Sequence, residues 1–189
     1  MLFYFLQFFL AWLYSHFLEY MLHKFLLHKP KRKKWFKTHF GEHHRSAKRY
    51  LMLDSKYIGF PTISGDPEIK GLLLLALLHG PLVYFWPIAY CTLVLCAFSY
   101  YFQHRLFHQN MTYARDYASW HYDHHMAPDQ HKNWGVRLPI FDWLFGTRKV
   151  YKGSKVERIK FVLQRQKIER EIHEIRSRST SGRKPPSIS

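Results

Sequence analysis

Ten of the fourteen histidines in this chain fall into four short boxes. Imidazole binds iron, zinc or copper while it is neutral near physiological pH, so histidines that recur at short spacing are typical of metal ligands. One box would be weak support for a metal site, but four boxes in 189 residues predict a site for two metal ions. The boxes are His23 and His28; His39, His43 and His44; His104 and His108; and His121, His124 and His125.

The third and fourth boxes have spacings that suit α-helices. Each residue of a helix advances about 100°, so His104 and His108 lie one above the other on one face. His121, His124 and His125 are also predicted to share a face, because offsets of three and four residues bring side chains together.

The first two boxes are less regular. His39 and His43 are predicted to stack on one helical face, which leaves His44 turned about 100° away and free to reach a second metal. His23 and His28 are five residues apart, which is poor for one face of a regular helix. A proline follows two positions after His28, so we expect the helix to end there and its unwinding to bring His28 round.

Other uses of histidine explain the pattern less well. Haem takes one or two axial ligands, which would leave most of the box histidines without a role. A zinc transporter or zinc store does not require repeated spacings of two to four residues. A metalloprotease would need His-Glu-x-x-His, and the sequence lacks that motif.

Two apolar segments predict an integral membrane protein. Residues 1–18 carry no formal charge, and apolar character continues to Leu22, which is about the length that crosses a bilayer. We interpret this segment as an uncleaved anchor, because it has neither the basic start nor the cleavage site of a signal peptide. Residues 71–104 are also uncharged, and Gly80-Pro81 and Trp86-Pro87 should break them into a helical hairpin.

The hairpin returns all four boxes to one side of the membrane. Residues 24–49 contain ten lysines and arginines and residues 105–149 contain six, whereas the amino terminus and the hairpin tip contain none. The positive-inside rule therefore predicts that the metal site lies on the cytoplasmic face. Membrane orientation and anionic lipid headgroups also explain the net charge of +16, and no nucleic-acid-binding motif accompanies it.

The chain is expected to have three parts. Residues 1–150 form the all-α, membrane-embedded domain that carries the boxes. Residues 151–176 place apolar residues at helical spacing among many charges, which predicts an amphipathic basic helix on the membrane or on the domain. Residues 177–189 are rich in serine, arginine and proline, which predicts a disordered tail.

Several residues outside the boxes are candidates for supporting roles. Asp123 lies within the fourth box and could orient a ligand imidazole by accepting its second N–H. His131 is a candidate auxiliary or outer ligand. Glu19 lies four residues before His23, where an ionisable group in an apolar helix suggests either function or a structural hydrogen bond. Asp142 is expected to tie the following loop to the core.

With these features, the sequence resembles the fatty acid hydroxylase and sterol desaturase superfamily. The resemblance covers residues 10 to 150 and rests on the order of the boxes, the apolar hairpin between the second and third, and residues 133–147. It implies a non-haem di-iron centre, with the ten box histidines as ligands, that uses O2 and two electrons to hydroxylate or desaturate a lipid. The larger members have a pair of amino-terminal anchors, and some carry a fused haem-containing donor domain; this sequence has one anchor and no such domain.

We therefore expect a membrane-bound oxygenase that hydroxylates a fatty acyl, sterol or related lipid. A carotenoid hydroxylase and a lipid desaturase are the enzymatic alternatives, and a histidine-rich metal-binding membrane protein is the non-enzymatic one. Electrons should come from an external ferredoxin or small cytochrome with its reductase, because no motif for flavin, nicotinamide or haem is recognisable. Zinc can replace iron in isolated protein, since it accepts the same imidazoles.

Overall fold

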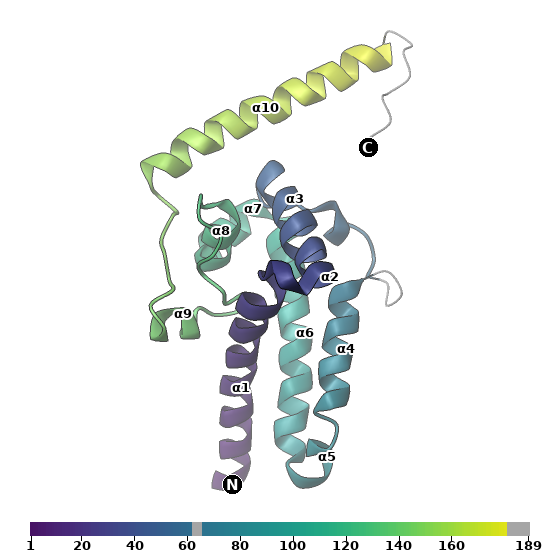
Figure 1. Cartoon of the computed structure of the whole chain (residues 1–189), viewed down its shortest axis with the longest axis vertical. Helices are drawn as coiled ribbons and strands as arrows, with labels where there is room; N and C mark the ends of the chain where they lie inside the picture. Colours follow the sequence, from purple (N-terminus) through teal and green to yellow (C-terminus); the bar gives the residue numbers. More distant parts are fainter. Residues whose placement is uncertain (62–65, 181–189) are drawn as a thin grey trace.

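The computed structural model describes residues 1–61 and 66–180, and all regular structure within them is helical, which confirms the all-α prediction (Figure 1). The longer helices are α1 (Leu2–Leu22), α4 (Pro67–Leu78), α6 (Pro87–Gln109) and α10 (Lys155–Thr180). The shorter ones are α2 (Lys33–Phe36), α3 (His44–Arg49), α5 (Leu82–Phe85), α7 (Met111–Tyr117), α8 (Ser119–Met126) and α9 (Ile140–Leu144). Four single turns complete the set: the π turns η1 (His23–Leu27) and η3 (Lys37–His43), and the 3₁₀ turns η2 (Pro30–Arg32) and η4 (Ser55–Tyr57).

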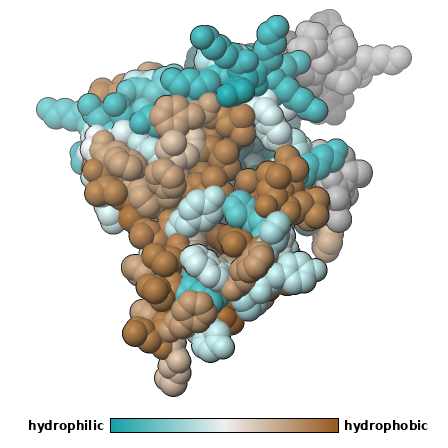
Figure 2. All heavy atoms as spheres, turned by 60° about the horizontal axis from the view of Figure 1, so that its bottom comes forward, coloured by the Kyte–Doolittle hydropathy of each residue, from teal (hydrophilic) through white to brown (hydrophobic). Residues whose placement is uncertain are grey.

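Three helices form an apolar stalk. Helix α6 packs against both α1 and α4, and α5 makes the turn between α4 and α6 at the lower end of the molecule (Figure 1). The hairpin breaks where the sequence predicted, because Pro81 follows the end of α4 and Pro87 occupies the first turn of α6. Apolar side chains cover much of the face at this end (Figure 2), and Leu77, Tyr84 and Phe85 are among the exposed ones.

The predicted membrane-spanning segments are not supported by this structure. None of the helices formed by residues 1–61 and 66–180 is both long enough and apolar enough to cross a bilayer. The hairpin turn limits α4 to 12 residues, about 18 Å, against a hydrocarbon core of about 30 Å. Helix α6 has 23 residues, but its last two turns carry Gln103, Arg105 and two box histidines.

Short helices gather at the other end of the stalk and hold a second core. Helices α7 and α8 pack together, and α3 packs on α8. Their buried contacts include Met52, Phe107, Ala114, Tyr122 and Val136. The four boxes lie at this junction, because η1 continues from the end of α1, η3 leads into α3, and the third box occupies the end of α6.

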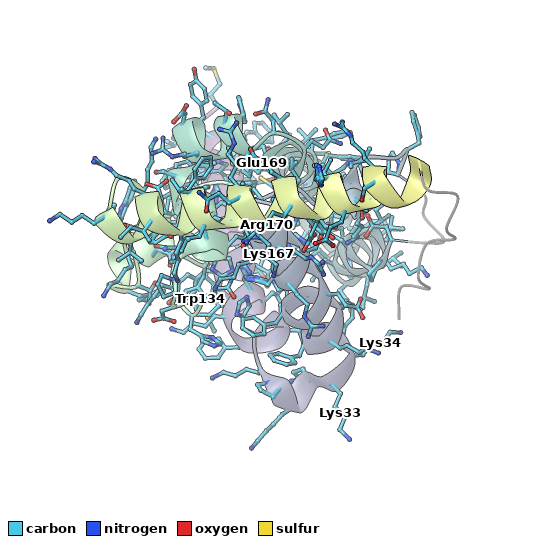
Figure 3. All side chains as sticks on the ribbon, turned by 90° about the horizontal axis from the view of Figure 1, so that it is seen from above. Lys33, Lys34, Trp134, Lys167, Glu169 and Arg170 are labelled. Atoms are coloured by element: carbon cyan, nitrogen blue, oxygen red, sulfur yellow. The ribbon has the colours of Figure 1, made fainter. Side chains whose placement is uncertain are left out.

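Helix α10 lies across the end of the molecule opposite the hairpin tip (Figures 1 and 3). It is fixed at its start by Glu157, whose carboxylate pairs with Arg115 at 2.8 Å and accepts the Tyr122 hydroxyl at 2.9 Å. The helix was expected over residues 151–176, but it begins at Lys155 and continues to Thr180. The last nine residues of the expected tail, 181–189, lie outside the described part of the chain.

A polar clasp joins the loop before α9 to the rest of the domain. Asp142 accepts the backbone N–H groups of Trp134 at 2.8 Å and Gly135 at 2.7 Å, and the Thr147 hydroxyl at 2.6 Å. A buried carboxylate that receives three donors is well compensated for the loss of water. Asp142 therefore holds the following loop through Thr147, as expected, and it also holds the loop before α9, which was not expected.

Gly135 is the position where this clasp tolerates no side chain. A Cβ there would lie 2.3 Å from the Leu138 carbonyl oxygen, so the backbone would have to move. We expect Gly135→Ala to lower the free energy of unfolding by at least about 1 kcal/mol. Gly59→Ala is the matched control, because nothing lies within 4 Å of its added Cβ. Equal denaturation midpoints for the two variants would contradict this account.

Candidate metal centre

The structure brings the ten box histidines together as two adjacent clusters. In the first, His23, His28, His39, His44 and His124 each offer a nitrogen within 4.8 Å of the others. In the second, His43, His104, His108 and His125 do the same. His121 joins the second cluster, since its Nε2 lies 3.0 Å from that of His108. Each cluster thus gathers five imidazoles, and all ten are buried except the half-buried His39.

Two π-helical turns place four of these ligands. A π turn closes its hydrogen bond between residues i and i+5, so side chains five apart come to the same side. His23 and His28 are related in this way across η1, and His39 and His44 across η3. The rings meet accordingly: Nε2 of His39 lies 3.2 Å from Nε2 of His44, and the ring centroids of His23 and His28 are 5.0 Å apart.

This geometry corrects the predicted division of the second box. His39 was expected to share a metal with His43 while His44 turned away, but His39 groups with His44 and His43 joins the other cluster. The reason is that η3 is wound as a π helix rather than an α-helix, which moves the shared face from i+4 to i+5.

The fourth box also divides between the clusters. His124 and His125 were expected to share a face with His121, but they are successive residues whose side chains diverge by about 100°. His124 joins the first cluster and His125 the second. Helix α8 therefore contributes to both clusters and lies between them.

Hydrogen bonds at Nδ1 fix the tautomer of five ligands. A carbonyl oxygen can only accept, so Nδ1 carries the proton and Nε2 keeps its lone pair. The acceptors at Nδ1 of His23, His108 and His124 are the carbonyls of Trp134, Met52 and Lys132, at 2.6 to 2.7 Å. Carboxylates act in the same way on the other two: Asp54 accepts from His43 at 2.7 Å and Glu68 from His104 at 2.6 Å.

The distances between the Nε2 atoms match the ligand shell of a metal ion. Nε2 of His44 lies 3.1 Å from that of His28, 3.2 Å from that of His39 and 3.1 Å from that of His124. Ligands at right angles around an ion with bonds of about 2.1 Å would be about 3.0 Å apart, against about 3.4 Å in a tetrahedron. The observed distances lie between these two values, so these four nitrogen atoms could hold one metal ion together.

Burial favours the neutral form of several of these imidazoles. Loss of water lowers the pKa of His44, His124 and His125 well below 6.5, and the neighbouring imidazoles lower it further. A buried neutral imidazole that directs a lone pair at its neighbours is in the form that binds a metal ion. In the second cluster, Nε2 of His43 and Nε2 of His104 are buried and have no hydrogen-bond partner among the described residues.

Sequence reasoning missed the two carboxylates that support the second cluster. Asp54 and Glu68 lie outside every box, and each is close to a helix start, where an acidic residue usually serves as a cap. Their real partners are 11 and 36 residues away, respectively, and only the packing of the chain brings them together. The acidic first turn of α4 was a signal for a helix terminus but not for a histidine partner.

The predicted supporting residues have different outcomes. Asp123 is turned away from the histidines; its carboxylate accepts the Lys152 N–H at 2.7 Å and pairs with Arg148 at 2.8 Å, because it lies on the opposite side of α8. Thus Asp123 does not orient an imidazole. His131 is exposed at the rim, with its ring 5.5 Å from that of His28.

Glu19 supports the site indirectly, through a loop that contacts a histidine. It accepts the backbone N–H groups of Val136 and Arg137 and forms a buried ion pair with the Arg137 guanidinium at 2.7 Å. These bonds hold the loop that presents the Trp134 carbonyl to His23. Glu19 is therefore a structural anchor of the first cluster.

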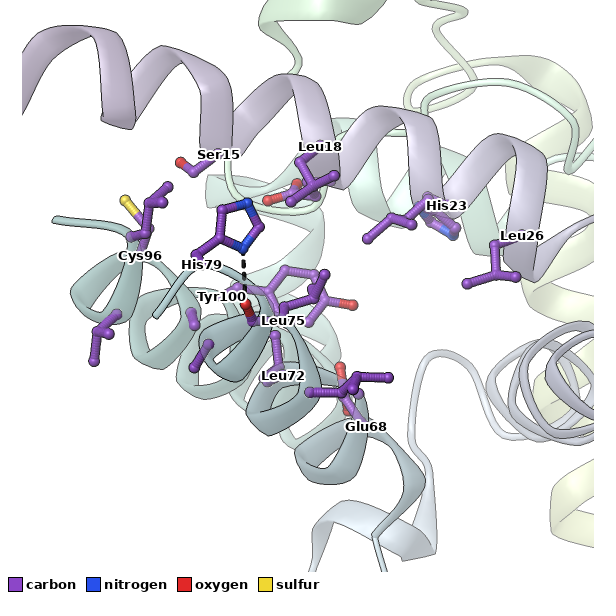
Figure 4. Close-up of a pocket in the computed structure, with 18 of the residues that line it drawn as sticks. Ser15, Leu18, His23, Leu26, Glu68, Leu72, Leu75, His79, Cys96 and Tyr100 are labelled. Carbon is purple, nitrogen blue, oxygen red and sulfur yellow. Dashed lines mark hydrogen bonds between the residues drawn. The ribbon is translucent and has the colours of Figure 1, made fainter. Parts of the chain in front are cut away.

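An apolar groove ends at the histidine clusters. It has a volume of about 230 Å³, lies between α1 on one side and α4 and α6 on the other, and is lined mainly by leucines with Val94 and Ala97 (Figure 4). His23, Glu68 and Tyr100 line its inner end. Because a ligand of the first cluster and the partner of His104 both face the groove, an apolar molecule bound in it would reach the clusters.

Removing the charge at Asp54 should weaken metal binding. Asp54→Asn keeps the cap of η4 but gives His43 a neutral acceptor, so we expect affinity to fall about tenfold in a metal titration. Asp123→Asn is the matched control, since that buried carboxylate pairs with Arg148 instead of a histidine. Equal losses of affinity in both variants would mean that Asp54 acts only through the stability of the fold.

Acid should destabilise the metal-free protein. The pKa of His44, His124 and His125 is lower in the folded state than in the unfolded one, so the stabilising contribution of each is present above pH 6.5 and lost as pH falls below it. We expect the free energy of unfolding to fall between about pH 7 and about pH 5, by about 1 kcal/mol per pH unit for each such histidine. Chemical denaturation at several pH values measures this, and a flat profile would contradict it.

Comparison with known proteins agrees with this geometry. The family model described as fatty acid hydroxylase matches residues 8–147, which include all ten box histidines. Neither the curated proteins nor the solved structures gave a match. The match confirms the resemblance noted in the sequence, and the family implies an oxidoreductase of the lipid hydroxylase or desaturase type. The chain belongs to the fatty acid hydroxylase family.

Proposed function

We propose that this protein hydroxylates a lipid with O2 and two electrons at a pair of iron ions held by the two histidine clusters. The observation that carries the proposal is the meeting of two adjacent histidine clusters with an apolar groove, which His23 of the first cluster lines. A metal store would need the clusters but has no use for the groove. A lipid-binding protein would need the groove but has no use for ten clustered imidazoles.

In the proposed reaction one oxygen atom enters a C–H bond as a hydroxyl group. The other leaves as water, and the two electrons arrive with two protons. When bound, the iron ions would supply the activation of O2 that an unreactive C–H bond requires. Nitrogen ligands of intermediate softness suit iron in both of its common oxidation states.

The residues of this chain would bind the apolar substrate and orient the histidines. The groove positions an apolar chain by its shape and excludes water from the inner end, where water would quench an oxidant. Asp54 and Glu68 hold His43 and His104 in fixed orientations by accepting from their Nδ1 atoms. The carbonyls of Trp134, Met52 and Lys132 do the same for three further ligands.

We also propose that the apolar end of the molecule lies in a lipid membrane, with the metal centre on its cytoplasmic side. The apolar residues exposed on α1, α4 and α5, such as Phe5, Leu77 and Phe85, support contact with lipid. Exposed cations between η1 and α2 would then lie beside anionic headgroups. Electrons would come from an external ferredoxin or small cytochrome with its reductase.

The test is a lipid profile of cells that express the chain, by mass spectrometry. We expect a lipid heavier by one oxygen with the intact chain, and its loss with His124→Ala combined with His125→Ala, because this pair removes one ligand from each cluster. His173→Ala is the matched control, since His173 is exposed on α10 and should leave the product unchanged.

The alternative outcomes are distinct. A product lighter by two hydrogens would make the protein a desaturase. Iron-loaded protein that consumes no O2 with a competent donor and a total lipid extract would overturn the oxygenase and favour a metal-binding role. A carotenoid product in carotenoid-producing cells would move the substrate to that class.

A further inference from the structure

The far end of the apolar groove is closed by a polar side chain. His79, the residue that ends α4, lines the groove about 16 Å along the helix from Glu68, from the rise of eleven residues. Figure 4 shows its ring lying in the gap between α4 and α1, whereas His23 lies toward the other end. Ser15 and Tyr90 line the same distal region.

Two hydrogen bonds fix the position of this ring. The Leu75 carbonyl accepts from Nδ1 of His79 at 2.7 Å, so Nε2 carries a lone pair. That atom lies 3.1 Å from the Tyr14 hydroxyl, which donates to it from α1. The two rings also meet edge to face, with centroids 5.7 Å apart. His79 is therefore held across the groove by both walls, and a chain that pushes its ring aside must break its hydrogen bond to Tyr14.

We propose that the Tyr14–His79 pair is a stop that sets how long an apolar chain can extend beyond the reacting carbon. This inference rests on the proposed function, because it takes the groove as the place of the substrate chain. Most of the groove surface between its inner end and His79 is apolar, so a saturated chain of matching length would bury most of its length there. A longer chain must displace the ring and break the bond to Tyr14.

The experiment measures binding apart from turnover. The iron-loaded protein in lipid nanodiscs is given a fluorescent fatty acid, which is then displaced by unlabelled saturated fatty acids that lengthen in two-carbon steps. We expect affinity to rise with length and then to drop about tenfold or more at the first chain that meets His79, since even one excess methylene is costly in a fitted pocket. Product formation across the same series should follow this profile.

Variants at the stop should move the limit in opposite directions. Tyr14→Ala with His79→Ala opens the distal end, so the chain that first loses affinity should become a longer one. His79→Trp fills the groove and should move the limit to a shorter chain. Tyr14→Phe removes the hydrogen bond but keeps the ring, and should leave the limit within one step while lowering stability.

Tyr84→Ala is the matched control, since Tyr84 is an exposed tyrosine at the hairpin tip and does not line the groove. It should leave the limit unchanged. A limit that stays fixed in both His79→Trp and the double alanine variant would overturn the stop, even if wild-type protein forms product. Wild-type protein that binds the series with a clear limit but never forms product would instead overturn the proposed function and leave the stop supported.

Discussion

The arrangement of this protein depends on the convergence of imidazole nitrogens in a buried site. Lone pairs at about 3 Å repel one another, and protonation would add charge in a region of low dielectric. Hydrogen bonds from Nδ1 leave no choice of tautomer for His23, His108 and His124. A bound cation would relieve the repulsion between these lone pairs.

The same constraint explains why the chain keeps buried carboxylates despite its large positive charge. Asp54 and Glu68 stabilise their histidines through charge-assisted hydrogen bonds. Glu19 and Asp142 work further out, on the loop that carries the Trp134 carbonyl. These carboxylates form a supporting layer around the clusters, and each replaces the water that its partner lost on burial.

The groove and the clusters are built from the same helices. Helix α1 supplies one wall and continues through η1 into the first two ligands, while α6 supplies another wall and ends with His104 and His108. A shift of either helix would change both the seat of an apolar chain and the positions of the ligands. In the proposed reaction, the use of the same helices for the groove and for the clusters would keep the reacting carbon of the substrate at a fixed position relative to the metal centre.

The helical class, the hairpin break at the prolines and the grouping of ten histidines in boxes could be predicted from the amino-acid sequence, because these depend on local spacing and composition. Which histidines share a cluster could not be predicted, since the division depends on π turns that the i+4 pattern of an α-helix does not indicate. The sequence pattern also did not point to Asp54 and Glu68, or to the outward turn of Asp123. Those roles follow from contacts between segments that are distant along the chain, and no local pattern specifies such contacts.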